Sequence, residues 1–161
     1  MAASRHDHAP TELIEFLAKH DPATLSLVLA LRQVVLDTIA PCHEYIFQMR
    51  TKVMLLYGAT ARIMADGICQ MAIFRHHVTL VFPDGIDLED PTRVLRGTGR
   101  TMRYVRVAVP SDLVRPELRS LLRQARAAAG LGEQPRRGHP DVITRVKTSG
   151  RSTSAPIRGR Q

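Results

Sequence analysis

The stretch KVMLLYGATARIMADGICQMAIFRHHVTLVFPDG, residues 52–85, decides the fold class. Its apolar residues follow a period near two and are rich in β-favouring side chains, which is typical of strands. Two Asp-Gly pairs, Asp66-Gly67 and Asp84-Gly85, mark reversals, because glycine readily adopts the conformations of tight turns. The stretch therefore predicts consecutive strands joined as an antiparallel meander.

Helices are expected on both sides of this stretch. Thr11 can cap a first helix that runs to about His20, and Asp21 can cap a second that begins at Pro22. The second helix is apolar around most of its surface and ends before Pro41, so it belongs in the middle of the domain. A last helix is expected over 116–130, which begins with proline and ends with glycine.

Two more strands complete the expected sheet, EYIFQM at 44–49 and MRYVRVAV at 102–109. Between the fourth and fifth strands, a short helical turn is expected at 91–97, opened by Asp90. The predicted order is ααββββ(α)βα. It indicates an α+β fold in which helices pack on one face of an antiparallel sheet of about five strands.

The 161 residues fit one domain, which we place at 11–129 after a flexible N-terminus at 1–10. Residues 130–161 hold seven Lys and Arg against two acids, are rich in Gly, Pro, Ser and Thr, and are predicted to be a disordered basic tail. The polar N-terminus favours a cytoplasmic location, and the most apolar stretch, 25–36, is too short to span a membrane.

The adjacent pair His76-His77 cannot converge on one ion, because successive strand side chains point to opposite faces. We expect one to be solvated and the other to bond a loop or cap the sheet. Cys42-His43-Glu44 contains a nucleophile, a base and a carboxylate, but three successive side chains diverge. No catalytic constellation is found, and no enzyme is expected.

Four acids lie close together in PDGIDLEDP, and clustered carboxylates can hold a hard cation such as iron or magnesium. They are Asp84, Asp87, Glu89 and Asp90. The alternative is structural, because Asp84 begins an ordinary turn and Asp90 stands where a helix cap is expected.

An anion or a partner is expected near LRGTGRTMRYVRV, where arginines surround a Gly-Thr-Gly turn and guanidinium groups and backbone amides can act together. Tyr104 and Arg106 share the exposed face of the predicted strand. The candidate binding residues are Arg100, Arg103, Tyr104, Arg106 and His77. The alternative is a tight turn beside a solvated basic face.

The basic tail raises a separate possibility, weak and sequence-independent binding of nucleic acid. It contains no aromatic residue on which a base could stack, so specific recognition is not expected there.

Two blocks, GIDLEDPTRVLRGTGRTMRYVRV at 85–107 and DLVRPELRSLLRQA at 112–125, together with CHEYIF and YGATARIMADGICQMAIFRHHVTLVF, resemble the YdhG-like family of small bacterial proteins. That family is catalogued as a domain of unknown function, and the similarity covers about Leu13 to Ala129. The resemblance implies an α+β domain with helices against an antiparallel sheet. Some members are described as frataxin-like iron chaperones, which implies Glu44 and Asp90 as iron-binding positions.

The leading prediction is a cytoplasmic, non-enzymatic module that binds a small anionic ligand or a protein partner, as a monomer or homodimer. A frataxin-like iron chaperone, with Glu44, Asp87, Glu89 and Asp90 as candidate ligands, is the first alternative. Loose nucleic-acid binding through the tail is the second.

Overall fold

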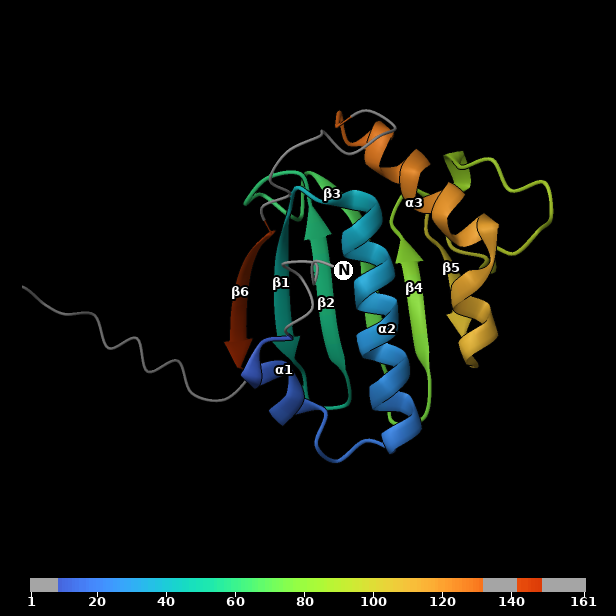
Figure 1. Cartoon of the computed structure of the whole chain (residues 1–161). Helices are drawn as coiled ribbons and strands as arrows, with labels where there is room; N and C mark the ends of the chain where they lie inside the picture. Colours follow the sequence, from blue (N-terminus) through green and yellow to red (C-terminus); the bar gives the residue numbers. More distant parts are fainter. Residues whose placement is uncertain (1–8, 132–141, 149–161) are drawn as a thin grey trace, which may run out of the picture.

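The computed structural model describes residues 9–131 and 142–148, which form one mixed sheet with helices on one face (Figure 1). The strand order is β5-β4-β3-β2-β1-β6, and every neighbouring pair is antiparallel except the parallel pair β1 and β6. The predicted α+β class and one-sided arrangement are confirmed. The elements are α1 (Thr11–Phe16), α2 (Pro22–Ile39), β1 (Cys42–Gln48), β2 (Val53–Gly58), β3 (Gly67–Ile73), β4 (Val78–Phe82), η1 (Gly85–Asp87), β5 (Arg103–Val107), η2 (Pro110–Val114), α3 (Pro116–Ala128) and β6 (Val142–Thr148).

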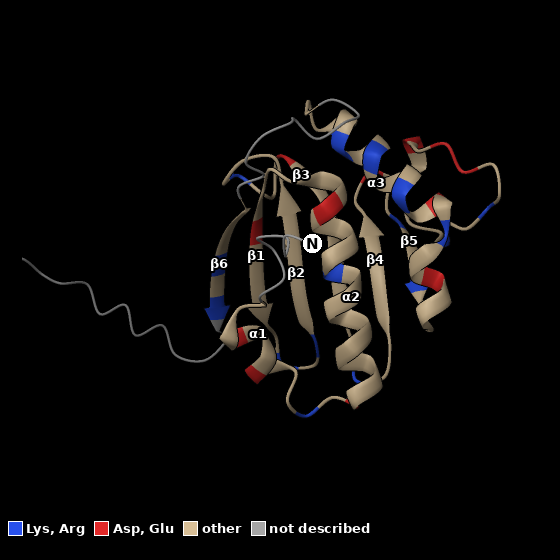
Figure 2. Cartoon of the chain, viewed as in Figure 1, with Lys and Arg blue, Asp and Glu red and all other residues tan. Residues whose placement is uncertain are grey.

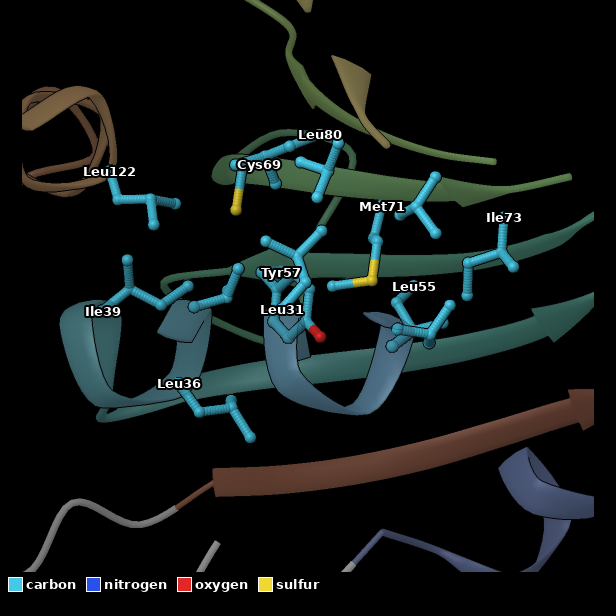
Figure 3. Packing of buried hydrophobic residues seen from close by; sticks show 14 of the residues in the cluster. Leu31, Leu36, Ile39, Leu55, Tyr57, Cys69, Met71, Ile73, Leu80 and Leu122 are labelled. Carbon is cyan, nitrogen blue, oxygen red and sulfur yellow. The ribbon is translucent and has the colours of Figure 1, made fainter. Parts of the chain in front are cut away.

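The core lies between α2 and the sheet. Leu31, Leu36 and Ile39 of α2 pack in one cluster with Leu55 and Met71 of the strands, and all five are fully buried (Figure 3). Each such side chain contributes roughly 1.5–3 kcal/mol by leaving water. This contact fixes which face of the sheet the helices cover.

Helix α2 is, among the described residues, the one long and apolar enough to cross a membrane, with a mean hydropathy of 1.4 over 18 residues. Half of it is buried within the fold, however, and the core helix of a globular domain has the same properties. Its apolar surface is used by the protein's own sheet.

Both predicted helix caps are wrong in detail. Pro10, not Thr11, precedes the first helical residue, and α1 ends at Phe16 well before His20. Asp21 does precede α2, but its carboxylate makes no capping hydrogen bond to the helix. That carboxylate lies 2.6 Å from Nδ1 of His76 instead, because the β3–β4 turn passes beside the start of α2.

The expected helical turn at 91–97 is absent from the structure. Asp90 instead holds a wide turn, in which its carboxylate accepts hydrogen bonds from the amides of Val94 (3.0 Å) and Leu95 (2.9 Å). Arg93 within this turn has a φ of +56°, a left-handed conformation that does not continue a helix.

The predicted disorder of 130–161 is wrong for residues 142–148, which form β6 and pair with β1 along its length. The segment VITRVKT has β-branched residues at 142, 144, 146 and 148 and charged residues at 145 and 147, and β1 would otherwise expose an unpaired edge. Pairing provides hydrogen-bond partners for the backbone N–H and C=O groups of both strands. This stabilisation orders the segment although its polar composition predicts disorder. Residues 132–141 and 149–161 of the predicted tail, and residues 1–8 of the predicted flexible N-terminus at 1–10, lie outside the described residues.

Candidate binding face

The two faces of the sheet differ in what they contact. Tyr57 and Met71 lie in the buried core cluster beneath the helices (Figure 3), and the buried Glu44 contacts Arg32 of α2. Their strand neighbours point to the opposite face, which no described helix covers (Figure 1). We call this second surface the open face. Cross-strand pairing aligns its side chains in two rows: Arg145, Tyr45, Leu56, Gln70, Val81 and Tyr104 in one, and Lys147, Phe47, Met54, Ala72, Thr79 and Arg106 in the other.

Aromatic rings and cations meet where β1 lies beside β6. The rings of Tyr45 and Phe47 stack with their centroids 5.9 Å apart and their planes at 17°. Arg145 donates a hydrogen bond of 2.8 Å from Nη1 to the Tyr45 hydroxyl, and its Cζ lies 5.7 Å from that ring's centroid. Lys147 places Nζ 5.7 Å from the centroid of Phe47. Each cation is held against an aromatic ring by direct strand pairing.

A groove of about 430 Å³ borders this cluster. Tyr45, Phe47 and Leu56 line one side, the segment 61–65 lines the other, and Lys147 stands at its margin. Met64 from that segment is 86% exposed. The groove therefore offers apolar walls beside a positive charge.

The predicted anion-binding residues do not form one site. Tyr104 and Arg106 lie together on the open face at β5, and both are exposed, as predicted. Arg103 lies on the alternate side of the strand and donates hydrogen bonds from Nη1 to the carbonyls of Gly99 (2.6 Å) and Met102 (2.7 Å). Arg100 is an exposed loop residue. Arg103 thus stabilises its own loop.

The loop before β5 holds the Tyr104 ring in place. Arg96 and Tyr104 exchange two backbone hydrogen bonds of 2.8 and 2.9 Å. Gly97 has a φ of +117°, and a β-carbon added there would lie 3.4 Å from two ring carbons of Tyr104. The glycine therefore lets the backbone pass close under the ring, which fixes one end of the first row.

The two histidines take separate roles. His76 is 65% exposed at its side chain and contacts Asp21, whereas the His77 ring stacks on Phe74 at a centroid distance of 4.6 Å. Burial and then the positive charge of Arg106 lower the pKa of His77. His77 is therefore an uncharged neighbour of Arg106 at neutral pH, at the end of the open face.

The predicted metal site is wrong as a single cluster. Glu44 is buried under the helices, and Asp90 holds its own turn. Glu89 bonds Gln124 through its backbone amide and carbonyl, and Asp87 lies in η1. Within 9–131 and 142–148, no group of three or more His, Cys, Asp or Glu side chains is placed to hold a metal ion.

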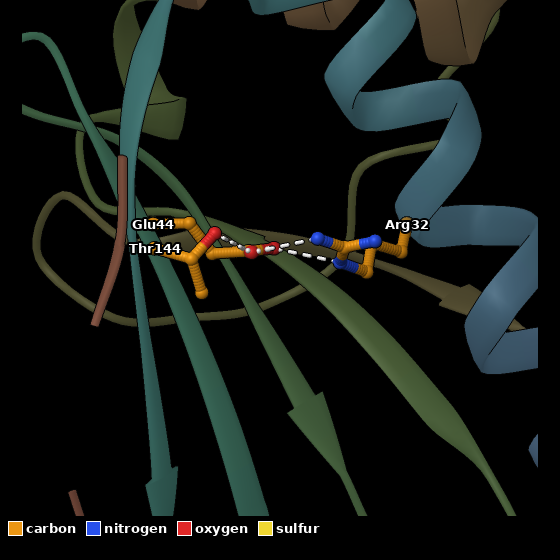
Figure 4. A network of polar contacts seen from close by, with 3 residues as sticks. All are labelled: Arg32, Glu44 and Thr144. Carbon is orange, nitrogen blue, oxygen red and sulfur yellow. Dashed lines mark hydrogen bonds and ion pairs between the residues drawn. The ribbon is translucent and has the colours of Figure 1, made fainter. Parts of the chain in front are cut away.

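Glu44 has a different partner set, which the sequence did not reveal. Arg32 of α2 donates two hydrogen bonds of 2.9 Å to the Glu44 carboxylate, one from Nε and one from Nη2 (Figure 4). Thr144 of β6 donates a third, also of 2.9 Å. Burial alone would lower the pKa of Arg32, but the hydrogen bond and charge of Glu44 raise it above its usual range. This network joins α2, β1 and β6.

The thiols of Cys42 and Cys69 are not activated as nucleophiles. Burial, and then the negative charge of Glu44, raise the pKa of the Cys42 thiol to about 12, and burial raises that of Cys69. Only the thiolate is a nucleophile, so neither side chain is activated at neutral pH.

Sequence reasoning missed the β1–β6 part of the face, namely Tyr45, Phe47, Arg145 and Lys147. The available signal was the alternation in VITRVKT, whose charged positions 145 and 147 share one side of a strand. Nothing local indicates that this strand joins β1.

The chain matches no protein-family model, no curated protein and no solved structure. The resemblance to the YdhG-like family stays a prediction from the sequence.

Proposed function

We propose that the protein is a non-enzymatic binding module that holds an anionic partner against the open face of its sheet. The observation that supports this proposal is the uniformly positive charge of the open face. The described strand residues of the two rows include three cations, Arg106, Arg145 and Lys147, and no Asp or Glu. A surface with one sign of charge attracts ligands of the opposite sign.

The placement of these cations supports an extended partner. Arg106 stands on one edge strand, β5, and Arg145 and Lys147 stand on the other, β6. Figure 2 shows basic residues in blue on β6. Five strand spacings separate the edges, which amounts to about 24 Å. A partner with several negative charges along its length can contact both edges, whereas a compact anion contacts one edge at a time.

A titration with inorganic pyrophosphate, followed by amide chemical shifts in NMR, tests the proposal. We expect the largest shifts on β1, β5 and β6, with strong dependence on ionic strength. The double variant Arg106→Ala with Lys147→Ala should lose most of the response. Arg123→Ala, which removes an exposed cation from α3, is the matched control and should keep it.

Shifts centred on α3, or an equal loss in Arg123→Ala, would show that pyrophosphate does not use the open face. Unfolding midpoints of the double variant and of the control that match the parent protein ensure that a lost response reports binding and not unfolding.

A further inference from the structure

The open face combines its cations with an unusual arrangement of rings. Tyr45 and Phe47 form a stacked pair on β1, and Tyr104 stands across the sheet on β5 with 36% of its surface exposed. Two of the three tyrosines of the chain therefore lie on this face, and the third, Tyr57, is fully buried under the helices. Rings without a role in the core are available for contacts with a partner.

The groove beside the aromatic pair fits a flat apolar group. Its walls are Phe47 and Leu56 on the strands and Ile63 and Met64 on the facing segment, with Lys147 at the margin. A planar ring inserted there extends the Tyr45–Phe47 stack, while a negative group attached to that ring reaches the lysine. Flat rings joined to anionic groups at regular spacing are the repeating unit of a nucleic-acid strand.

We infer that the anionic partner is single-stranded nucleic acid, whose bases stack on the Tyr45–Phe47 pair and whose phosphates contact the cations of β5 and β6. The inference rests on the proposed function and names its ligand class. Stacking platforms beside positive charge characterise proteins that bind single strands without sequence preference.

The chemistry of the face favours an unpaired strand over other polyanions. In a duplex the bases are stacked on one another, so a flat sheet surface cannot reach their faces. An acidic protein would satisfy the cations but would not need stacked rings. Stacking on aromatic rings accepts any base, so weak sequence preference is expected.

Fluorescence anisotropy with a labelled twelve-nucleotide oligo-dT tests the inference. Phe47→Leu should weaken binding by about 5- to 150-fold, the range for losing one stacked base, while Phe47→Tyr should bind like the parent protein. With three phosphate contacts, the logarithm of the binding constant should fall with the logarithm of the salt concentration with a slope of about −2. Lys147→Ala should reduce the magnitude of that slope by about 0.7. A hairpin duplex of equal charge should bind more weakly than the single strand.

Tyrosine emission gives an independent readout, because the chain has no tryptophan. Bases stacked on Tyr45 should quench it in proportion to occupancy, and the quenching should persist in Arg123→Ala.

The outcomes separate this inference from the proposed function. Pyrophosphate binding at the open face without oligo-dT binding overturns the nucleic-acid inference and leaves the anion-binding module intact. Equal affinity of Phe47→Leu and Phe47→Tyr for oligo-dT also overturns it, and so does self-association through the open face in analytical ultracentrifugation that oligo-dT does not disperse. Failure of both probes removes the proposed function as well.

Discussion

The two faces of this sheet use charge in opposite ways. On the helix-covered face, Glu44 is fully buried, and its charge is neutralised by a bidentate ion pair with Arg32. On the open face, Arg145 and Lys147 rest against aromatic rings with no carboxylate nearby in the two rows. A buried charge must be matched within the fold, whereas a charge at the surface keeps its attraction for something outside.

The largest expected difference concerns the buried ion pair. Glu44→Ala should lower the free energy of unfolding by about 3–5 kcal/mol, because Arg32 is left as a buried charge without its carboxylate. The exposed pair of Asp21 and His76 is the comparison, and Asp21→Ala should cost about 0–1 kcal/mol. Urea unfolding of both variants checks this. Equal losses would mean that burial does not distinguish the two pairs.

Adjacent leucines on β2 sharpen the comparison further. Leu55 faces the helices and is fully buried, and Leu56 lines the groove of the open face. Leu55→Ala should cost about 2–5 kcal/mol of stability and leave the affinity of the folded protein for oligo-dT unchanged. Leu56→Ala should cost clearly less stability but weaken oligo-dT binding. The assignment of the faces is wrong if the two variants exchange these effects.

Alkaline pH gives the smallest expected effect, again on the helix-covered face. The pKa of Cys42 is about 12 in the folded protein and near 8.5 when the chain is unfolded. The folded state thus retains a proton that the unfolded state releases, so stability is complete below pH 8.5 and is lost as pH rises. The free energy of unfolding should fall by about 1 kcal/mol per pH unit above pH 8.5, which amounts to roughly 1–2 kcal/mol by pH 10.

Unfolding in urea with a reductant from pH 7 to 10 measures this slope. Cys42→Ala should have a shallower slope than the parent protein. An identical slope would show that the thiol does not carry the effect.

Local patterns predicted most of the elements. The first five strands and the long helices α2 and α3 follow from alternation, proline positions and turn glycines, and the exposure of Tyr104 and Arg106 follows from strand parity. Predictions that assigned a specific partner to a side chain were less successful. Asp21 and Glu44 each bind a residue that no local pattern identifies, His76 and Arg32 respectively.

The sequence by itself determined which side chains share a face, because a strand's period of two is a property of the backbone. Only the tertiary structure decided what meets on each face: residues 100 positions apart, Tyr45 with Arg145 and Glu44 with Thr144, come together when β6 pairs with β1. The reason is that the pairing is stabilised by hydrogen bonds along the whole edge of the sheet. That edge exists only after distant segments have folded together, so no short segment of the sequence predicts it.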